Sequence, residues 1–229
     1  MYHRAVESLR LGDGPQMDHY YDIAFTAPVR QLQEAKGSRS RPPQEVGDAS
    51  TPQRLGPAEI EHITARDSLY LSTIGETGWP YVQHRGGAAG FVKVLDESTI
   101  GWLERNGNRQ YIGTGNITAD DRVALIMVDY ANRQRLKLFG RATYHPQATP
   151  ELITATGEEK MRSDGAITIE VAGYSWNCSK YITPRFATDQ IHTLLAPYQE
   201  RIADLETGLD AANQELQRLR HTDDHVPDR

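Results

Sequence analysis

Short apolar runs with polar neighbours occupy the middle of the chain. They are rich in Val, Ile, Leu and Tyr, and Gly, Asn or Asp residues separate most of them. The runs are Leu69–Ile74, Pro80–Arg85, Phe91–Leu95, Thr99–Leu103, Val123–Asp129, Arg135–Tyr144 and Ile167–Tyr174. Seven short strands within about a hundred residues are typical of a β-barrel or a β-sandwich.

Several segments around these strands have helical character. Thr26–Lys36 predicts a short helix, and a second helix is expected to begin at Pro57, where acidic residues follow in the first turn. Residues Arg109–Ala119 predict a third helix, and a fourth should follow Thr149, which can cap it, with Pro150 in its first position. The pattern therefore predicts a mainly β fold with peripheral helices.

The C-terminal segment has a different periodicity. Its apolar residues alternate spacings of three and four, as in the a and d positions of a heptad repeat. They are Leu195, Tyr198, Ile202, Leu205, Leu209, Ala212, Leu216 and Leu219. One interpretation is a long amphipathic helix that lies on its own barrel, and the other is a coiled-coil-like helix that pairs between subunits.

A change in composition divides the chain into parts. Residues 37–57 are rich in Pro, Gly, Ser and charge, which is typical of a linker or a surface loop. We therefore expect an N-terminal extension and linker over 1–55, a barrel over 56–187, and an amphipathic helix and tail over 188–229.

Composition excludes several classes of protein. The chain has 229 residues, of which 38% are hydrophobic and 24% charged, and no uncharged stretch approaches the length of a membrane span. A single cysteine, Cys178, allows no internal disulfide. We expect a cytoplasmic protein with no membrane partner.

The charge distribution favours a small anionic ligand. The net charge is −6, yet Arg85–Arg141 carries nine basic residues against six acidic ones. Nucleic-acid binding would need an extended basic patch, so no nucleic-acid partner is expected.

The familiar catalytic and metal-binding motifs are absent, and the eight histidines never have the close spacing of a helical metal pair. No catalytic residue and no metal site can therefore be named. Three cationic clusters are more informative: Gln83–Gly87 with Lys93 after it, Asn106–Gln110, and Arg133–Lys137. Guanidinium groups and unpaired N–H groups at a helix start both bind phosphate.

Several segments, in their order and spacing, resemble the pyridoxamine 5′-phosphate oxidase-like FMN-binding split-barrel family. The segments are Gly78–Arg85, Gly90–Asp96, Gly107–Tyr111, Asn116–Val123 and Arg135–Gly140. The resemblance covers about residues 56–187 and implies a split β-barrel that binds FMN. It also implies a homodimer, because the flavin sites of such barrels lie between subunits.

The resemblance also implies which residues contact the cofactor. Positions near the isoalloxazine ring and the phosphate correspond to Arg85, Lys93, Asn108, Arg109 and Gln110, and three later positions correspond to Arg135, Trp176 and Arg185. The chain departs from authentic pyridoxamine phosphate oxidases near its C-terminus. Of their Arg-x-His-x-Arg pattern, only the final arginine remains in Tyr181–Arg185.

The function expected from the resemblance is that of an FMN-dependent oxidoreductase. It would act on an unknown small-molecule substrate and a reductant, with pyridoxamine phosphate not expected as the substrate. One alternative is a non-catalytic flavin-binding protein, and another is a haem-binding split barrel with His84 or His192 as an axial ligand. A deazaflavin cofactor, which related split barrels use, is also left open.

Overall fold

The computed structural model describes residues 19–38, 52–105, 107–157 and 163–223. It divides into two compact units, residues 1–182 and residues 183–229. We call them the barrel unit and the tail unit and describe each by itself.

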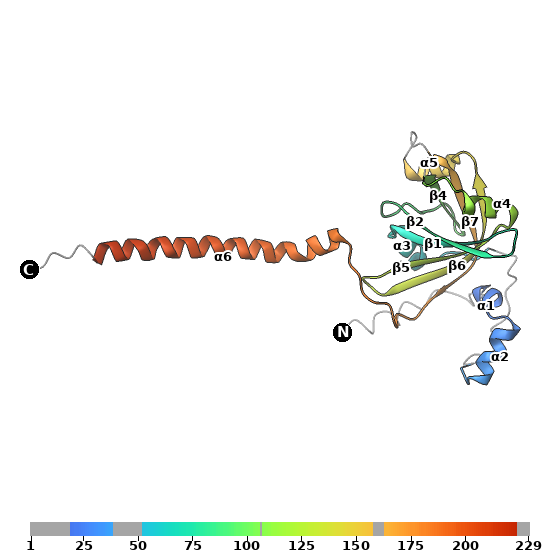
Figure 1. Cartoon of the computed structure of the whole chain (residues 1–229), viewed down its shortest axis with the longest axis horizontal. Coiled ribbons are helices and arrows are strands. Elements are labelled where there is room, and N and C mark those ends of the chain that lie inside the picture. The colour runs from blue at the N-terminus through green and yellow to red at the C-terminus, as the bar shows by residue number, and fades with distance from the viewer. Residues whose placement is uncertain (1–18, 39–51, 106, 158–162, 224–229) are drawn as a thin grey trace, which may run out of the picture. The chain divides into compact units, whose positions relative to one another are not determined.

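The barrel unit is built on one antiparallel sheet (Figure 1). Its seven strands lie in the spatial order β2-β1-β5-β6-β7-β4-β3. They are β1 (Ser68–Ile74), β2 (Pro80–Gly86), β3 (Lys93–Val94), β4 (Thr99–Arg105), β5 (Arg122–Asp129), β6 (Gln134–His145) and β7 (Ser163–Trp176). Each strand overlaps one of the seven runs predicted from sequence, so the mainly β fold class is confirmed.

The sheet must curl, because its two edge strands are consecutive in the chain. A flat sheet would separate β2 from β3 by six inter-strand spacings, about 29 Å. The seven residue steps from Gly86 to Lys93 span at most about 25 Å, and this connection also contains a turn in which Phe91 N donates to Ala88 O. The sheet therefore forms an open, split barrel.

The barrel interior is filled by alternate residues of the strands. Leu71, Ile100, Met127, Leu136 and Ile169 are each completely buried there. Helix α3 (Pro57–Thr64) adds Ile63 to the same core. This helix has proline in its first turn, and Glu59 Oε2 accepts a hydrogen bond from Gly56 N at 3.0 Å.

Other short helices surround the sheet. Helix α1 (His19–Ala24), which the periodicity did not predict, packs on β6 and β7 and stacks Tyr20 on Phe139 with ring centroids 4.9 Å apart. Helix α2 (Ala27–Ala35) follows it directly. Helix α5 (Pro150–Thr156) begins as predicted, with Thr149 Oγ1 accepting from Leu152 N. Helix α4 (Ile112–Ala119) starts three residues later than the prediction of Arg109.

The tail unit contains one long helix, α6 (Thr188–Asp223). Its apolar seam residues are exposed: Leu205 has 55% of its surface accessible and Leu209 has 61%. None of the helices in the described part of the chain combines the length and apolar content that a membrane span requires.

Candidate functional site

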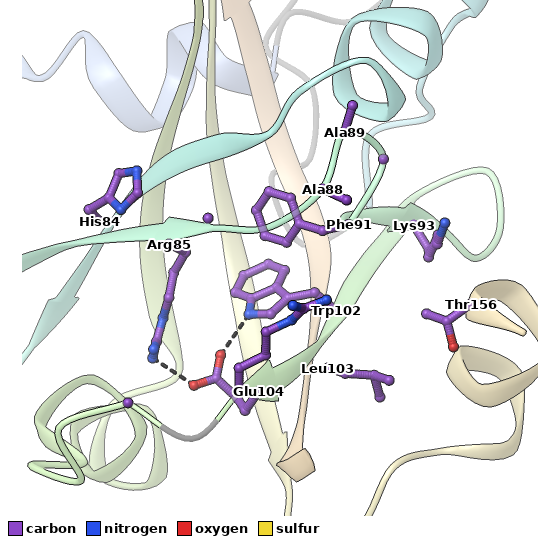
Figure 2. A pocket seen from close by; sticks show the side chains of 14 residues that line it. His84, Arg85, Ala88, Ala89, Phe91, Lys93, Trp102, Leu103, Glu104 and Thr156 are labelled. Carbon is purple, nitrogen blue, oxygen red and sulfur yellow. Dashed lines mark hydrogen bonds and ion pairs between the residues drawn. The ribbon is translucent and has the colours of Figure 1, made fainter. Parts of the chain in front are cut away.

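Two adjoining cavities open beside β2 and β4, and the residues that line both are His84, Arg85, Glu104, Arg105 and Gly107. The first has a volume of about 270 Å³ and extends toward Phe91, Lys93 and Trp102 (Figure 2). The second, of about 260 Å³, extends to the start of helix α4. Each volume is close to the lower end of the range for small-molecule sites, about 300 Å³, and together they exceed it.

A buried carboxylate lies where the two cavities adjoin. Glu104 lies on β4 with 6% of its surface exposed, and its Oε2 is 2.8 Å from Arg85 Nη2. Its other oxygen, Oε1, accepts a hydrogen bond from Trp102 Nε1 at 2.7 Å. Figure 2 shows both contacts meeting at the Glu104 carboxylate.

Burial and charge act in opposite directions on this carboxylate. Burial raises the pKa of Glu104 above its ordinary value of 4.5, whereas the charge of Arg85 and the indole N–H of Trp102 lower it, and the net shift is upward. With its amide oxygen facing the guanidinium, Gln83 also accepts from Arg85 Nε at 2.7 Å. Arg85 is therefore committed to partners within the protein, and its positive charge is offset by Glu104.

The cationic groups of the second cavity lie in the loop before α4. Arg105 and Arg109 line this cavity with exposed side chains, and neither makes an ion pair with a residue in the described ranges. Asn108 Oδ1 accepts from Gln110 N at 3.2 Å, which closes a side-chain turn in the loop. The structure thus places Asn108, Arg109 and Gln110 in the lining of one cavity together with Arg85.

Helix α4 begins at this cavity. Its first three residues, Ile112, Gly113 and Thr114, line the wall, and no side chain caps the helix at Tyr111. The first N–H groups of a helix have no partner within it and favour an anion. The second cavity therefore combines three arginines, of which Arg85 is paired with Glu104, with the positive end of a helix. Asp164, which accepts from Tyr111, is a second carboxylate in its lining.

The first cavity is more apolar. Phe91 lies against its inner wall, where Gly87 leaves room, because a Cβ on Gly87 would lie 2.7 Å from Phe91 Cβ. Lys93, half-buried on β3, faces the same space. Lys93 and Arg85 thus line the same cavity.

Arg135 and Trp176 lie elsewhere within the chain. Trp176 pairs with Leu136 at one end of the β6–β7 ladder, whereas Ala166, ten residues earlier on β7, pairs with Leu103 beside the cavities. Ten residues of strand span about 33 Å. Arg185 belongs to the tail unit, so its place relative to the cavities is not described.

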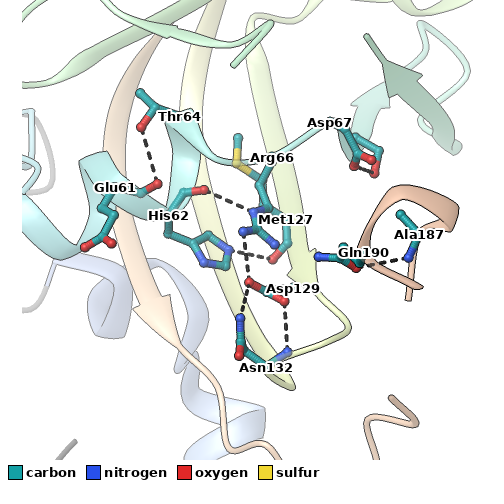
Figure 3. Close-up of polar contacts among 11 residues, drawn as sticks. Glu61, His62, Thr64, Arg66, Asp67, Met127, Asp129, Asn132, Ala187 and Gln190 are labelled. Atoms are coloured by element: carbon teal, nitrogen blue, oxygen red, sulfur yellow. Dashed lines mark hydrogen bonds and ion pairs between the residues drawn. The ribbon is translucent and has the colours of Figure 1, made fainter. Parts of the chain in front are cut away.

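Trp176 instead belongs to a buried polar network on α3 and β5. Its Nε1 donates to Glu59 Oε1 at 2.5 Å, and its ring meets His62 edge-on. Figure 3 shows the remainder of the network, in which Arg66 Nη2 lies 2.9 Å from Asp129 Oδ2. His62 Nε2 lies 3.3 Å from Met127 O, and burial, with the charge of Arg66, lowers the pKa of His62.

Sequence reasoning missed several residues of the cavities, namely Glu104, Arg105, Tyr111, Tyr144 and Asp164. Tyr111 and Tyr144 both donate to Asp164, to its Oδ2 at 3.1 Å and to its carbonyl oxygen at 2.7 Å. One signal in the sequence could have found Glu104. This glutamate lies two residues after Trp102 in an otherwise apolar strand, and residues i and i+2 of a strand lie on the same face of the sheet.

The two histidines predicted as alternative haem ligands are His84 and His192. His192 belongs to the tail unit, and His84 lines the edge of both cavities while its ring contacts a residue of β1. His84 is exposed and meets the ring of Tyr70 edge-on, with ring centroids 5.6 Å apart, on the face of β2 opposite Arg85. Within the residues that the structure describes, no group of three or more His, Cys, Asp or Glu side chains is arranged to hold a metal ion.

Comparison with known proteins gives one family. The sequence profile described as "Pyridoxamine 5′-phosphate oxidase" matches residues 57–171. A search of curated proteins finds no match.

Similar solved structures share low identity with this chain. One is a putative pyridoxamine 5′-phosphate oxidase from Lactobacillus delbrueckii, with 19% identity, 53% of this chain and 93% of that chain covered, and a TM-score of 0.42. The haem storage protein HutZ from Vibrio cholerae has 17% identity, coverage of 54% and 94%, and a TM-score of 0.40. An FMN-binding protein from Syntrophomonas wolfei has 9% identity, coverage of 52% and 86%, and a TM-score of 0.40.

Proposed function

Because this chain belongs to the pyridoxamine 5′-phosphate oxidase family, we propose that it binds FMN in the two adjoining cavities and acts as an FMN-dependent oxidoreductase on a small substrate. The observation that carries this proposal is the meeting of Arg105, Arg109 and the start of α4 in one cavity that continues into a second, more apolar one.

The second cavity suits the phosphate of FMN. A phosphate dianion needs several donors, and arginine offers them in a planar, often bidentate arrangement. Arg105 and Arg109 supply two such groups, and the unpaired N–H groups of Ile112 and Gly113 supply more. Arg85 has a lesser share in phosphate binding, because Glu104 already offsets its charge.

The first cavity suits the ring system. Phe91 offers an apolar surface, and Lys93 offers a cation to a polar ring edge. Bound FMN would supply the acceptance and donation of hydride or single electrons. The chain itself has to position the ring, exclude part of the solvent and leave one ring face open to a substrate, which requires no acid or base of its own.

Arg135 and Trp176 enter this proposal through a second subunit. Within one chain they lie at the far end of the β6–β7 ladder from the cavities. If they contact FMN as predicted, they do so from the partner in a homodimer. Trp176 is 39% exposed, so it can still pack against another surface.

A titration of purified, FMN-free protein with FMN tests the proposal. Loss of one charged hydrogen-bond donor costs about 1.5–3 kcal/mol, so Arg109→Ala should weaken FMN binding about 10- to 100-fold. Arg141→Ala is the matched control, because Arg141 pairs with Asp121 on the surface and does not line either cavity. Equal affinities of the two variants would contradict the phosphate assignment, and no binding by the unmodified protein would contradict the function.

A second measurement separates an enzyme from a non-catalytic flavin carrier. FMN-loaded protein is mixed with NADPH without oxygen, and the visible flavin absorption is followed. Bleaching faster than that of free FMN supports an oxidoreductase. Bleaching at the rate of free FMN, with dithionite still able to reduce the bound flavin, favours a carrier.

A further inference from the structure

Helix α6 carries an apolar seam that no described residue of the tail unit covers. The accessible fraction is 69% for Tyr198, 55% for Ile202 and 61% for Leu209. Amphipathic helices in water obtain most of their stability from packing of the apolar face. A helix of 36 residues with this seam therefore needs a partner surface.

We propose that two copies of this chain pair through α6 as a parallel, in-register, two-stranded coiled coil. The heptad assignment follows from the alternating spacings. Positions a are Leu195, Ile202, Leu209 and Leu216, and positions d are Ile191, Tyr198, Leu205, Ala212 and Leu219. Pro197, which lies inside the helix, takes a c position and stays outside the seam.

The charges beside the seam select the orientation. In a parallel pair, each g residue faces the e residue five positions later on the other helix, and such pairs set partner choice and orientation. Arg201 at g then faces Glu206, and Glu215 at g faces Arg220. Both contacts join opposite charges, and two-fold symmetry repeats each of them.

The other two g–e contacts of the parallel pair are uncharged. Leu194 faces Gln199, and Gly208 faces Asn213. No like charges therefore face one another along the seam. Residues five apart do not adjoin on a single helix, so neither the Arg201–Glu206 nor the Glu215–Arg220 contact can form within one chain. Within its own helix, Glu215 Oε2 lies 3.8 Å from Arg218 Nη1, an exposed pair that contributes little.

The antiparallel alternative is less favourable. With the two seams fully overlapped, Ala212 lies opposite Ile202, positions e face one another, and positions g face one another, where Arg201 meets Glu215. Glu206 then faces its own copy, which places two like charges together at the centre of the seam. The parallel arrangement avoids this contact. It also joins opposite charges at two places, Arg201–Glu206 and Glu215–Arg220, where the antiparallel arrangement has only Arg201–Glu215.

Disulfide formation in the full chain tests orientation and register. In a Cys178→Ser background, Ala212→Cys places a thiol in the seam, and Gln214→Cys places a matched thiol at the outward f position. A disulfide needs Cα atoms within about 4.4–6.8 Å, so the first variant should form the interchain bond at least about tenfold faster. Equal rates, or no bond in either variant, would overturn the pairing.

The same chemistry detects the antiparallel arrangement. Positions 202 and 212 lie ten residues apart along the seam, about 15 Å. In the parallel pair, an Ile202→Cys chain should therefore not cross-link to an Ala212→Cys chain. A mixture that forms the 202–212 bond in preference to the 212–212 bond would overturn the parallel assignment.

Charge reversal tests the g–e contacts. Arg201→Glu chains and Glu206→Arg chains each place like charges together when they pair with themselves, but opposite charges when they pair with each other. We co-express the two, each carrying Ala212→Cys and a different tag, and count the cross-linked species. Mixed pairs in clear excess over the statistical half support the proposal, and statistical assortment would overturn it.

Discussion

The contact between Arg85 and Glu104 makes a sharp prediction about the boundary of the two cavities. In Arg85→Met, the carboxylate of Glu104 loses its cationic partner and keeps only the indole N–H of Trp102. The side chains of Arg85 and Glu104 are 23% and 8% exposed, so the pair is mostly removed from water. Arg85→Met should therefore destabilise the folded chain.

The expected magnitude follows from this burial. Removing one partner of a fully buried ion pair costs about 3–5 kcal/mol. Because Arg85 is partly exposed, we reduce the expected loss to roughly 2–4 kcal/mol, or a fall in Tm of roughly 5–15 °C. Adding Glu104→Gln to Arg85→Met removes the unpaired charge, so the double variant should recover most of this loss.

The loss should also depend on pH. Without Arg85, the pKa of Glu104 rises further above 4.5 in the folded chain, so that the folded state holds a proton that the unfolded state has released. Stability then falls as the pH rises from 4.5 through the raised pKa. The Tm deficit of Arg85→Met should be smaller at pH 5.5 than at pH 8.

Thermal unfolding at both pH values measures these effects for the unmodified protein, Arg85→Met, Glu104→Gln and the double variant. A double variant whose loss equals the sum of the two single losses would refute the pairing. A deficit that is the same at both pH values would refute the unpaired carboxylate as its cause.

Three further predictions concern separate features of the molecule. Burial lowers the pKa of His62 below 6.5, so the stability of the fold should fall as the pH drops below about 6.5. His62→Gln should therefore reduce the change in Tm between pH 7.5 and pH 5.5. The control His84→Gln, at an exposed site, should leave that change as it is. Gly140→Ala should cost about 1–3 kcal/mol, because its Cβ would lie 2.5 Å from Ile169 Cγ2, and Gly115→Ala, which has open space, is the control for this unfolding measurement. Pyridoxamine 5′-phosphate should be a poor substrate for the FMN-loaded protein, and rapid oxygen-dependent formation of pyridoxal phosphate would contradict this.

The strands could be predicted because each has a local signature. The alternation of apolar and polar residues and the turn residues between the strands can be read directly from the sequence. The curl of the sheet follows from the short connection between its two edge strands. Helix α1 escaped prediction because it has only six residues and is held by the stacking of Tyr20 on Phe139. That contact joins positions more than a hundred residues apart, which no local pattern contains.

Several cations of the site could be predicted, although Arg105 was missed, but their partners could not be predicted. Arg85 and Arg109 have similar surroundings in the sequence, since Arg85 precedes a glycine and Arg109 follows an asparagine. The fold gives them different partners, because β4 places Glu104 against Arg85. Whether an arginine is paired or available depends on the strand beside it, and the pairing of strands is a property of the whole sheet.

The backbone conformation of the loop before α4 could not be predicted from the sequence, although its cationic residues could. Arg109 and Tyr111 both have positive φ, 59° and 51°, although neither is glycine. Such residues cost about 1–3 kcal/mol each and persist only where surrounding contacts hold them, often where a ligand binds. Here the side-chain turn of Asn108 and the bond from Tyr111 to Asp164 supply those contacts. They fix the backbone of Arg109 beside the unpaired N–H groups of α4 before any ligand arrives. An anion that enters this cavity therefore does not have to order the loop, and more of its interaction energy is retained as affinity.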